Sequence, residues 1–223
     1  YNYKNRNIIT PGNEDFVKEF LYEDEELHAN VGMLRDRFMN NAQALIHGDL
    51  HTGSIFINQE HTYVFDPEFA FYGPMGYDIG NVIANMFFAW CNGDATIEDP
   101  AEKEKFCGWI VDCICDIVDK FIEKFKVTYA EKVTDTMAKT EGFMEYYLGT
   151  ILADTAGVAG LETIRRTVGM ANNKDVTSIA DVEKRARAEK ILITLGKNYI
   201  MNRNSFTSGA CYRKAIEEAI AKF

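Results

Sequence analysis

Apolar residues recur at helical spacing over the first forty residues of the chain. A short helix is predicted over residues 14–22, with Asn13 as its N-cap, and a longer one over residues 25–40. The longer helix carries one apolar stripe, formed by Leu27, Val31, Leu34 and Phe38. This stripe predicts that one face of the helix is buried.

The pattern then changes from helical to strand-like. An apolar run at residues 44–46 leads directly into His47-Gly48-Asp49. Two more apolar runs, at residues 55–57 and 63–65, flank a polar turn and so predict a β-hairpin. The second of these strands ends at Asp66, which is followed by proline.

After a glycine- and proline-containing loop, the rest of the chain has only helical patterns. Asp78 is predicted to cap a helix over residues 79–90, and Asp99-Pro100 is predicted to begin a long helix that ends near residue 125. Further helices are expected over residues 129–139, 141–155, 161–172, 181–199 and 208–222. The expected fold class is therefore mainly α with a small β-hairpin.

Composition agrees with a folded domain and argues against two classes of partner. The chain has 223 residues, of which 47% are hydrophobic, so it can bury a substantial core. Its 24 Lys and Arg against 34 Asp and Glu give a net charge of −10, which repels nucleic acids and anionic lipids. We find no internal repeat or domain boundary, and residues 1–223 are treated as one domain.

Cysteine usage and the first residues bear on the setting of the protein. The chain has five cysteines, an odd number with no CxxC pair, which indicates buried or half-buried thiols in a reducing cytoplasm rather than a disulfide framework. No apolar run is long enough to span a membrane. The chain begins with Tyr1 rather than Met, and we expect it to be a piece of a longer protein.

Three acidic residues flank the predicted hairpin. Asp49 precedes its first strand, whereas Asp66 and Glu68 follow its second strand. Because a hairpin brings its outer ends together, we expect these carboxylates to converge. Carboxylate oxygens suit Mg²⁺, which retains room for phosphate oxygens. Each of the three also has a simpler interpretation, as a turn residue or a solvated loop acid.

These residues lie in motifs that resemble a known group of kinases. The run HGDLHTGS at residues 47–54 is similar to the catalytic loop of the aminoglycoside phosphotransferase superfamily, relatives of the protein kinases. Together with DPEFAFYGPMGYDIG at residues 66–80 and GLETIRR at residues 160–166, it resembles the S-methyl-5-thioribose kinase family. The resemblance implies the C-terminal lobe of a protein-kinase-like fold.

The resemblance also implies roles for single residues. Asp49 would orient the 1-hydroxyl of methylthioribose and accept its proton, and His51 would assist near the transferred phosphate of ATP. Asp66 and Glu68 would hold Mg²⁺. Ser54 stands where most of the superfamily has Asn, so we expect it to support the loop rather than to bind the metal directly.

The consecutive arginines Arg165 and Arg166 are expected to contact the sugar and the developing phosphate. Glu162 lies three and four positions before them, so ordinary helix-surface ion pairs are the alternative interpretation. His47 is expected to brace the loop, and Asp78 to serve as an N-cap whose counterpart in the family supports the catalytic loop. Aromatic residues at helical spacings are expected in the core rather than in a methylthio pocket: Phe87, Phe88, Trp90, Phe143, Tyr146 and Tyr147.

The chain lacks motifs that the resemblance would require upstream. Only Gly12 and Gly32 precede Gly48, so no glycine-rich phosphate loop is visible, and no strand-borne Lys precedes His47. We therefore expect the N-terminal ATP-binding lobe to be absent and this fragment to be inactive alone. The resemblance implies that the intact protein uses Mg²⁺ and ATP in methionine salvage. It also implies a homodimer. Two alternatives stay open: another small-molecule kinase of the superfamily, or an incompetent lobe that acts as a binding module.

Overall fold

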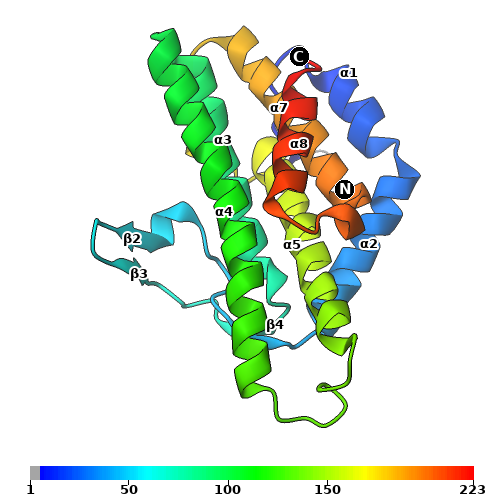
Figure 1. The fold of residues 1–223 in the computed structure, drawn as a ribbon. Helices are drawn as coiled ribbons and strands as arrows, with labels where there is room; N and C mark the ends of the chain where they lie inside the picture. The colour runs from blue at the N-terminus through cyan, green and yellow to red at the C-terminus, as the bar shows by residue number, and fades with distance from the viewer. Residues whose placement is uncertain (1–5) are drawn as a thin grey trace.

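Long helices make up most of the structure (Figure 1). It is a computed structural model that describes residues 6–223, so residues 1–5 of the expected domain lie outside the described residues. A π-helical turn, Lys18–Tyr22, continues the first helix, and 3-10 turns lie at Thr52–Ser54 and Arg203–Ser205. The helices are α1 Glu14–Val17, α2 Glu25–Asn40, α3 Gly76–Thr96, α4 Pro100–Lys132, α5 Phe143–Val168, α6 Lys174–Thr177, α7 Val182–Met201 and α8 Gly209–Ile220.

Four short strands form two separate antiparallel pairs. β2 (Ile55–Ile57) pairs with β3 (Thr62–Val64), as the sequence predicts, and this hairpin projects from the side of the helical bundle (Figure 1). β1 (Ala44–Ile46) pairs with β4 (Phe71–Gly73), a strand that falls partly within the expected loop. The prediction of a mainly helical fold with a small hairpin is confirmed, and the second strand pair is an addition to it.

One of the three predicted helix caps, Asp99, is confirmed, and Asp181 caps a further helix. The Asp99 carboxylate accepts a hydrogen bond from the Glu102 N–H, and the Asp181 carboxylate does the same at the start of α7. Asn13 stands at the N-cap of α1 but makes no cap bond: its amide nitrogen donates to Glu189 on α7, and its buried side-chain oxygen has no hydrogen-bond partner within the described residues. Asp78 lies inside the first turn of α3, since that helix begins at Gly76. A tertiary contact, to the loop after β1, therefore takes the carboxylate of Asp78.

Three predicted helix boundaries are wrong. The helix expected over residues 129–139 does not exist by itself, because α4 continues to Lys132 and turns follow it. The two helices expected over residues 141–155 and 161–172 are one continuous helix, α5. The small residues between them, AGVAG at 156–160, are buried and serve close helix packing rather than a break.

The core lies between the long helices, chiefly α3, α4, α5, α7 and α8. Phe87, Phe88 and Trp90 are buried there, which confirms their expected role. Phe143 and Tyr146 are exposed on the first turn of α5, so the same expectation is wrong for them. Their rings meet edge-on, and Phe143 also stacks on Tyr147.

The cysteines are free thiols, as the sequence predicts. All five cysteines are free: Cys91 and Cys107 are buried, and the other three are half-buried. Desolvation raises the pKa of the buried Cys91 thiol well above its ordinary value, which makes it a poor nucleophile. Within residues 6–223, no helix is long and apolar enough to cross a membrane.

Helices α3 and α5 approach each other so closely that two positions on α3 admit only glycine. A Cβ atom on Gly76 would lie 2.5 Å from the backbone nitrogen of Thr155, and one on Gly80 would lie 2.6 Å from the Thr155 carbonyl oxygen. Both obstacles are backbone atoms, which cannot rotate away. This contact brings the start of α3, with Asp78, beside the middle of α5.

We therefore predict that Gly80→Ala lowers the free energy of unfolding by about 1–3 kcal/mol, because the added methyl group overpacks the α3–α5 contact. The matched control is Gly149→Ala on α5, where a Cβ atom meets nothing within 4 Å. That control should raise stability by up to about 1 kcal/mol through helix propensity. Urea unfolding followed by circular dichroism measures both variants, and equal stabilisation by both would contradict the prediction.

Candidate active site

The loop after β1 is held by one carboxylate from helix α3. The Asp78 side chain accepts hydrogen bonds from the backbone N–H of His47, at 2.6 Å, and from that of Gly48, at 3.0 Å. These are charge-assisted bonds to two successive amides, which fix the direction in which the chain leaves the strand. The expected support of the loop by Asp78 is thus present, although its capping role is not.

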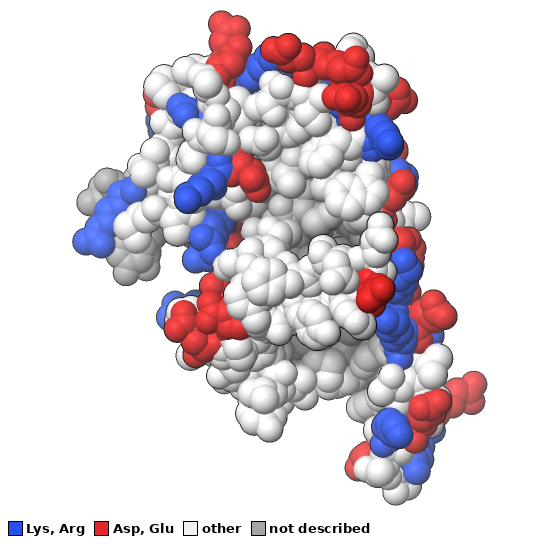
Figure 2. Space-filling view, turned by 90° about the vertical axis from the view of Figure 1, so that its left-hand side faces the viewer, with Lys and Arg blue, Asp and Glu red and all other residues white. Residues whose placement is uncertain are grey.

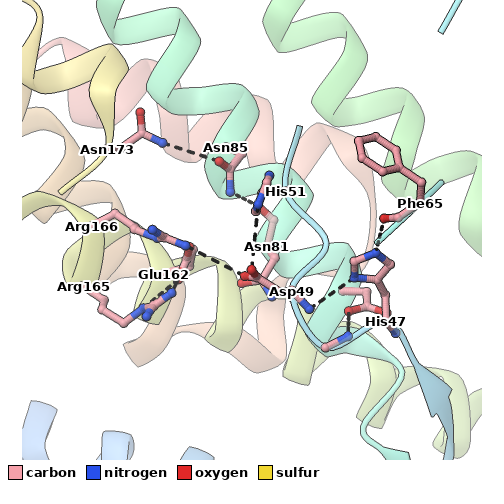
Figure 3. A network of polar contacts seen from close by, with 12 residues as sticks. His47, Asp49, His51, Phe65, Asn81, Asn85, Glu162, Arg165, Arg166 and Asn173 are labelled. Carbon is pink, nitrogen blue, oxygen red and sulfur yellow. Dashed lines mark hydrogen bonds and ion pairs between the residues drawn. The ribbon is translucent and has the colours of Figure 1, made fainter. Parts of the chain in front are cut away.

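Two further features shape the same turn. Gly48 has a φ of +85°, and a Cβ atom there would lie 2.2 Å from the Phe69 carbonyl oxygen, so this position requires glycine. The His47 ring bridges the loop and the hairpin: Nε2 lies 2.8 Å from the Phe65 carbonyl oxygen, and Nδ1 lies 3.3 Å from the Asp49 N–H (Figure 3). His47 therefore has the bracing position that the sequence suggests.

Asp49 projects from this turn between two positively ionisable side chains. Its carboxylate lies 3.9 Å from the Arg166 guanidinium and 3.8 Å from Nε2 of His51 (Figure 3). With 39% of its side chain exposed, Asp49 remains accessible to a ligand. The three residues come from two elements far apart in sequence, the loop after β1 and helix α5. A carboxylate in this setting can accept a proton while a cation stands beside it.

Glu162 organises both arginines and is itself buried. Its side chain is only 6% exposed, with one oxygen 2.9 Å from Nε of Arg165 and the other 2.8 Å from Nε of Arg166 (Figure 3). Arg166 is 24% exposed and turns toward Asp49, whereas Arg165 is 55% exposed. The i,i+3 and i,i+4 ion pairs of the alternative interpretation are therefore present, but they centre on a buried carboxylate rather than on an exposed one.

Buried amides and a tyrosine line the α3 side of this cluster. Asn85 donates to the Asn81 carbonyl oxygen at 2.9 Å, and Asn173 approaches Asn85 at 3.5 Å (Figure 3). Burial raises the pKa of the Tyr77 hydroxyl, and the negative charges of Glu162 and Asp49 raise it further. Sequence reasoning missed these residues, because asparagines on a helix give no signal until the fold is known.

Asp66 and Glu68 lie in the exposed loop between β3 and β4. Asp66 has a φ of +66°, a left-handed conformation that few residues other than glycine adopt. Over residues 6–223, no three His, Cys, Asp or Glu side chains are arranged to hold a metal, so the expected convergence with Asp49 is not present. Two exposed carboxylates still fit Mg²⁺, which commonly takes one or two carboxylates and completes its shell with water and phosphate.

The remaining two candidates occupy the 3-10 turn that leads into the hairpin. Ser54 is buried, and its backbone donates to the His51 carbonyl oxygen and accepts from the Phe65 N–H. These contacts fit a supporting position for Ser54, as expected. His51 packs close to Gly53, where a Cβ atom would lie 2.9 Å from the ring, and its Nε2 faces Asp49.

Comparison with known proteins gives the relationship of this chain. Residues 5–105 match the family described as "Phosphotransferase enzyme family". The chain is 36% identical to a methylthioribose kinase of Geobacillus sp. (strain WCH70) over 202 residues, which cover 91% of this chain. It is 37% identical to the methylthioribose kinase of Erwinia tasmaniensis over 185 residues and 34% identical to methylthioribose kinase 1 of Oryza sativa subsp. japonica over 197 residues, each covering 83% of this chain.

Over residues 5–105 the chain is thus similar to the phosphotransferase enzyme family, and over most of its length it is similar to methylthioribose kinases. The matched family region, residues 5–105, includes the loop with Asp49 and the hairpin. The chain spans about half the length of the curated relatives it matches, 48% of the Geobacillus protein and 46% of the rice protein.

We predict that Asp78→Asn loosens the loop that follows β1. An amide offers one acceptor where the carboxylate offers two, so the amides of His47 and Gly48 should exchange with solvent about tenfold faster or more. Hydrogen exchange followed by NMR measures this. Asp99→Asn is the matched control, because Asp99 also accepts a backbone N–H, but at the start of α4. Unchanged exchange at His47 and Gly48 in Asp78→Asn would contradict the assigned brace.

Proposed function

We propose that this chain is the substrate-binding, catalytic lobe of a kinase that transfers the γ-phosphate of ATP to the 1-hydroxyl of S-methyl-5-thioribose. The observation that carries the proposal is the position of Asp49, which leaves a braced turn and faces both Arg166 and His51 within 4 Å. The choice of substrate rests on the similarity of the chain to methylthioribose kinases. The reaction would belong to methionine salvage.

In this proposal Asp49 orients the substrate hydroxyl and accepts its proton as the oxygen attacks phosphorus. Arg166 stands beside that oxygen and offsets the charge that develops on the transferred group. Glu162 keeps the guanidinium in place through its 2.8 Å bond to Nε, so the cation is positioned before the substrate arrives. Phosphoryl transfer depends mainly on such positioning, since the protein itself forms no covalent bond.

Asp66 and Glu68 are proposed to hold Mg²⁺ with the nucleotide phosphates. The bound ion would neutralise phosphate charge, which the cluster around Asp49 does not do alone. That cluster contains two guanidinium groups, of Arg165 and Arg166, and two carboxylates, of Asp49 and Glu162, so these four charges cancel. Positive charge from outside the cluster is therefore needed when ATP binds.

We propose that a second lobe covers the strand face of this one. The side of the molecule from which the hairpin projects is largely uncharged, with charged groups gathered at its margins (Figure 2). Soluble monomers seldom leave so many large apolar side chains on one face. The matched relatives are about twice as long as the region they share with this chain. The exposed apolar residues on the strands and their loops include Leu45, Phe56, Ile57, Tyr63, Val64, Phe69 and Tyr72.

The proposed setting is the cytoplasm, which the five free cysteines support. A homodimer is proposed on the resemblance to the family alone. The partners proposed are the sugar, ATP and the second lobe.

We predict that Asp49→Asn lowers kcat of the complete protein with methylthioribose by about 10²–10⁴-fold, because the general base is lost. A coupled assay for ADP with Mg²⁺ measures turnover. The control is Glu60→Gln, which removes an exposed carboxylate from the turn between β2 and β3. The Glu60 side chain is 83% accessible. No turnover of methylthioribose by the unsubstituted complete protein would reject the proposed substrate, and turnover of another small alcohol in the same assay would identify a different kinase.

A separate prediction concerns the 223-residue chain by itself. It should show little or no turnover and weak binding of ATP, because the proposed second lobe, which would complete the nucleotide site over the strand face, is not part of this chain. Isothermal titration with Mg²⁺ and ATP measures the affinity. Robust turnover by this chain alone would contradict the proposed division into two lobes.

A further inference from the structure

We infer that the apolar tail of the sugar substrate binds in a cavity between helices α2, α3 and α5, beside the Asp49 cluster. This inference rests on the proposed function, because it names where the methylthio group of that substrate lies. The cavity has a volume of about 260 Å³. A dry protein cavity of roughly 150 Å³ already accommodates a benzene-sized molecule. There is therefore room for a methylthio group and part of a pentose.

The wall of the cavity formed by α2 and α5 is mainly apolar. Beside the exposed Arg35 of α2, it consists of Val31, Leu34, Phe38, Val158 and Leu161. The α2 residues belong to the apolar stripe predicted from the sequence. Leu34 is buried against α5, but Val31 and Phe38 are only half-buried. Part of the stripe thus faces an open space rather than a packed core.

Polar groups at the edge of the cavity connect it to Asp49. Tyr77, Asn81, Glu162 and Arg165 line the same space. Glu162 also holds Arg166, which lies 3.9 Å from the Asp49 carboxylate. A pentose bound between these groups has hydrogen-bond partners for its hydroxyls, while a tail on its far carbon meets only hydrocarbon. Ligand sites commonly combine an apolar wall with a few such polar groups.

A second apolar cavity competes for this assignment. It has a volume of about 330 Å³ and shares Leu161 and Arg165 with the first, but it lies at the end of α5, where Ile164 and Val168 meet Leu21 and Ile200. Neither Asn81 nor Glu162 lines it. Because it lacks the groups that lead to Asp49, the first cavity is the one assigned to the substrate.

The test uses the 223-residue chain with ¹³C-labelled Ile, Leu and Val methyl groups, titrated with methylthioribose and, separately, with ribose. We expect methylthioribose to shift the methyl signals of Val31, Leu34 and Val158, and ribose to shift them far less. Shifts at Ile164, Val168 and Ile200 instead would assign the tail to the second cavity and overturn the inference. Equal shifts with both sugars, or no shift, would also overturn it.

A variant makes the test quantitative. Val31→Phe fills the cavity from α2 and should weaken binding of methylthioribose about tenfold or more, with ribose binding unchanged, because one apolar group in a pocket contributes discrimination of that order. Met33→Phe is the matched control on the same helix, since Met33 is exposed and does not line this cavity. Should Val31→Phe fail to fold, the titration of the unsubstituted chain still decides the question.

The two proposals fail separately. ADP formation by the complete protein with methylthioribose, combined with no methyl shift in the cavity, would keep the kinase and reject the cavity. Methyl shifts in the cavity without any ADP formation would keep a methylthio-sugar site and reject the phosphorylation.

Discussion

The close contact between α3 and α5 is the constraint on which the candidate active site depends. Gly76 and Gly80 let the two backbones approach to distances that a single Cβ atom would prevent. Asp78 lies between these glycines and reaches the loop after β1. Glu162 and Arg166 lie farther along α5 on the side that faces this loop. One helix therefore holds the turn, and the other supplies the cation that meets Asp49.

The buried position of Glu162 changes what the two arginines can do. A carboxylate that is almost fully desolvated is costly unless cations and hydrogen bonds compensate it, and both arginines provide them. Their geometry is thus set by the interior of the protein rather than by a ligand. A cation that is fixed in this way loses less side-chain entropy when an oxygen-rich ligand binds. The arrangement also leaves the cluster without surplus positive charge, which explains why bound metal is part of the proposal.

Local signals in the sequence predicted the elements whose determinants are local. Asp99 followed by proline marks a helix start through a side-chain bond to a nearby amide, and that bond is present. Asp78 carries the same local signal, but the distant amides of His47 and Gly48 bind its carboxylate instead. The continuity of α5 could not be predicted either, because Gly157 and Gly160, which weaken an isolated helix, pack closely against Leu34 of α2 and the backbone of Gly196 on α7.

The candidate site shows the same division. The run from His47 to Asp49 and the twin arginines were recognisable as short motifs. The depth of Glu162 was not, since an i,i+4 pair with an arginine has the same spacing on a surface and in an interior. Asn81 and Tyr77 gave no signal at all, because helical spacing alone does not reveal which residues face a cavity. Burial is a property of the assembled helices and enters only with the structure.

The apolar stripe of α2 shows how substrate recognition and folding can share one surface. Leu27 is buried in the core, whereas the buried Leu34 and the half-buried Val31 and Phe38, from the same stripe, border the cavity. Helical geometry places all four on one face, so a pattern typical of core packing also forms one wall of a ligand site. The opposite wall belongs to α5, which carries Glu162 and both arginines. Helix α5 would therefore contact both the apolar tail and the polar hydroxyl end of the proposed substrate, and the separation of these contacts along the helix would set which sugars place a hydroxyl at Asp49.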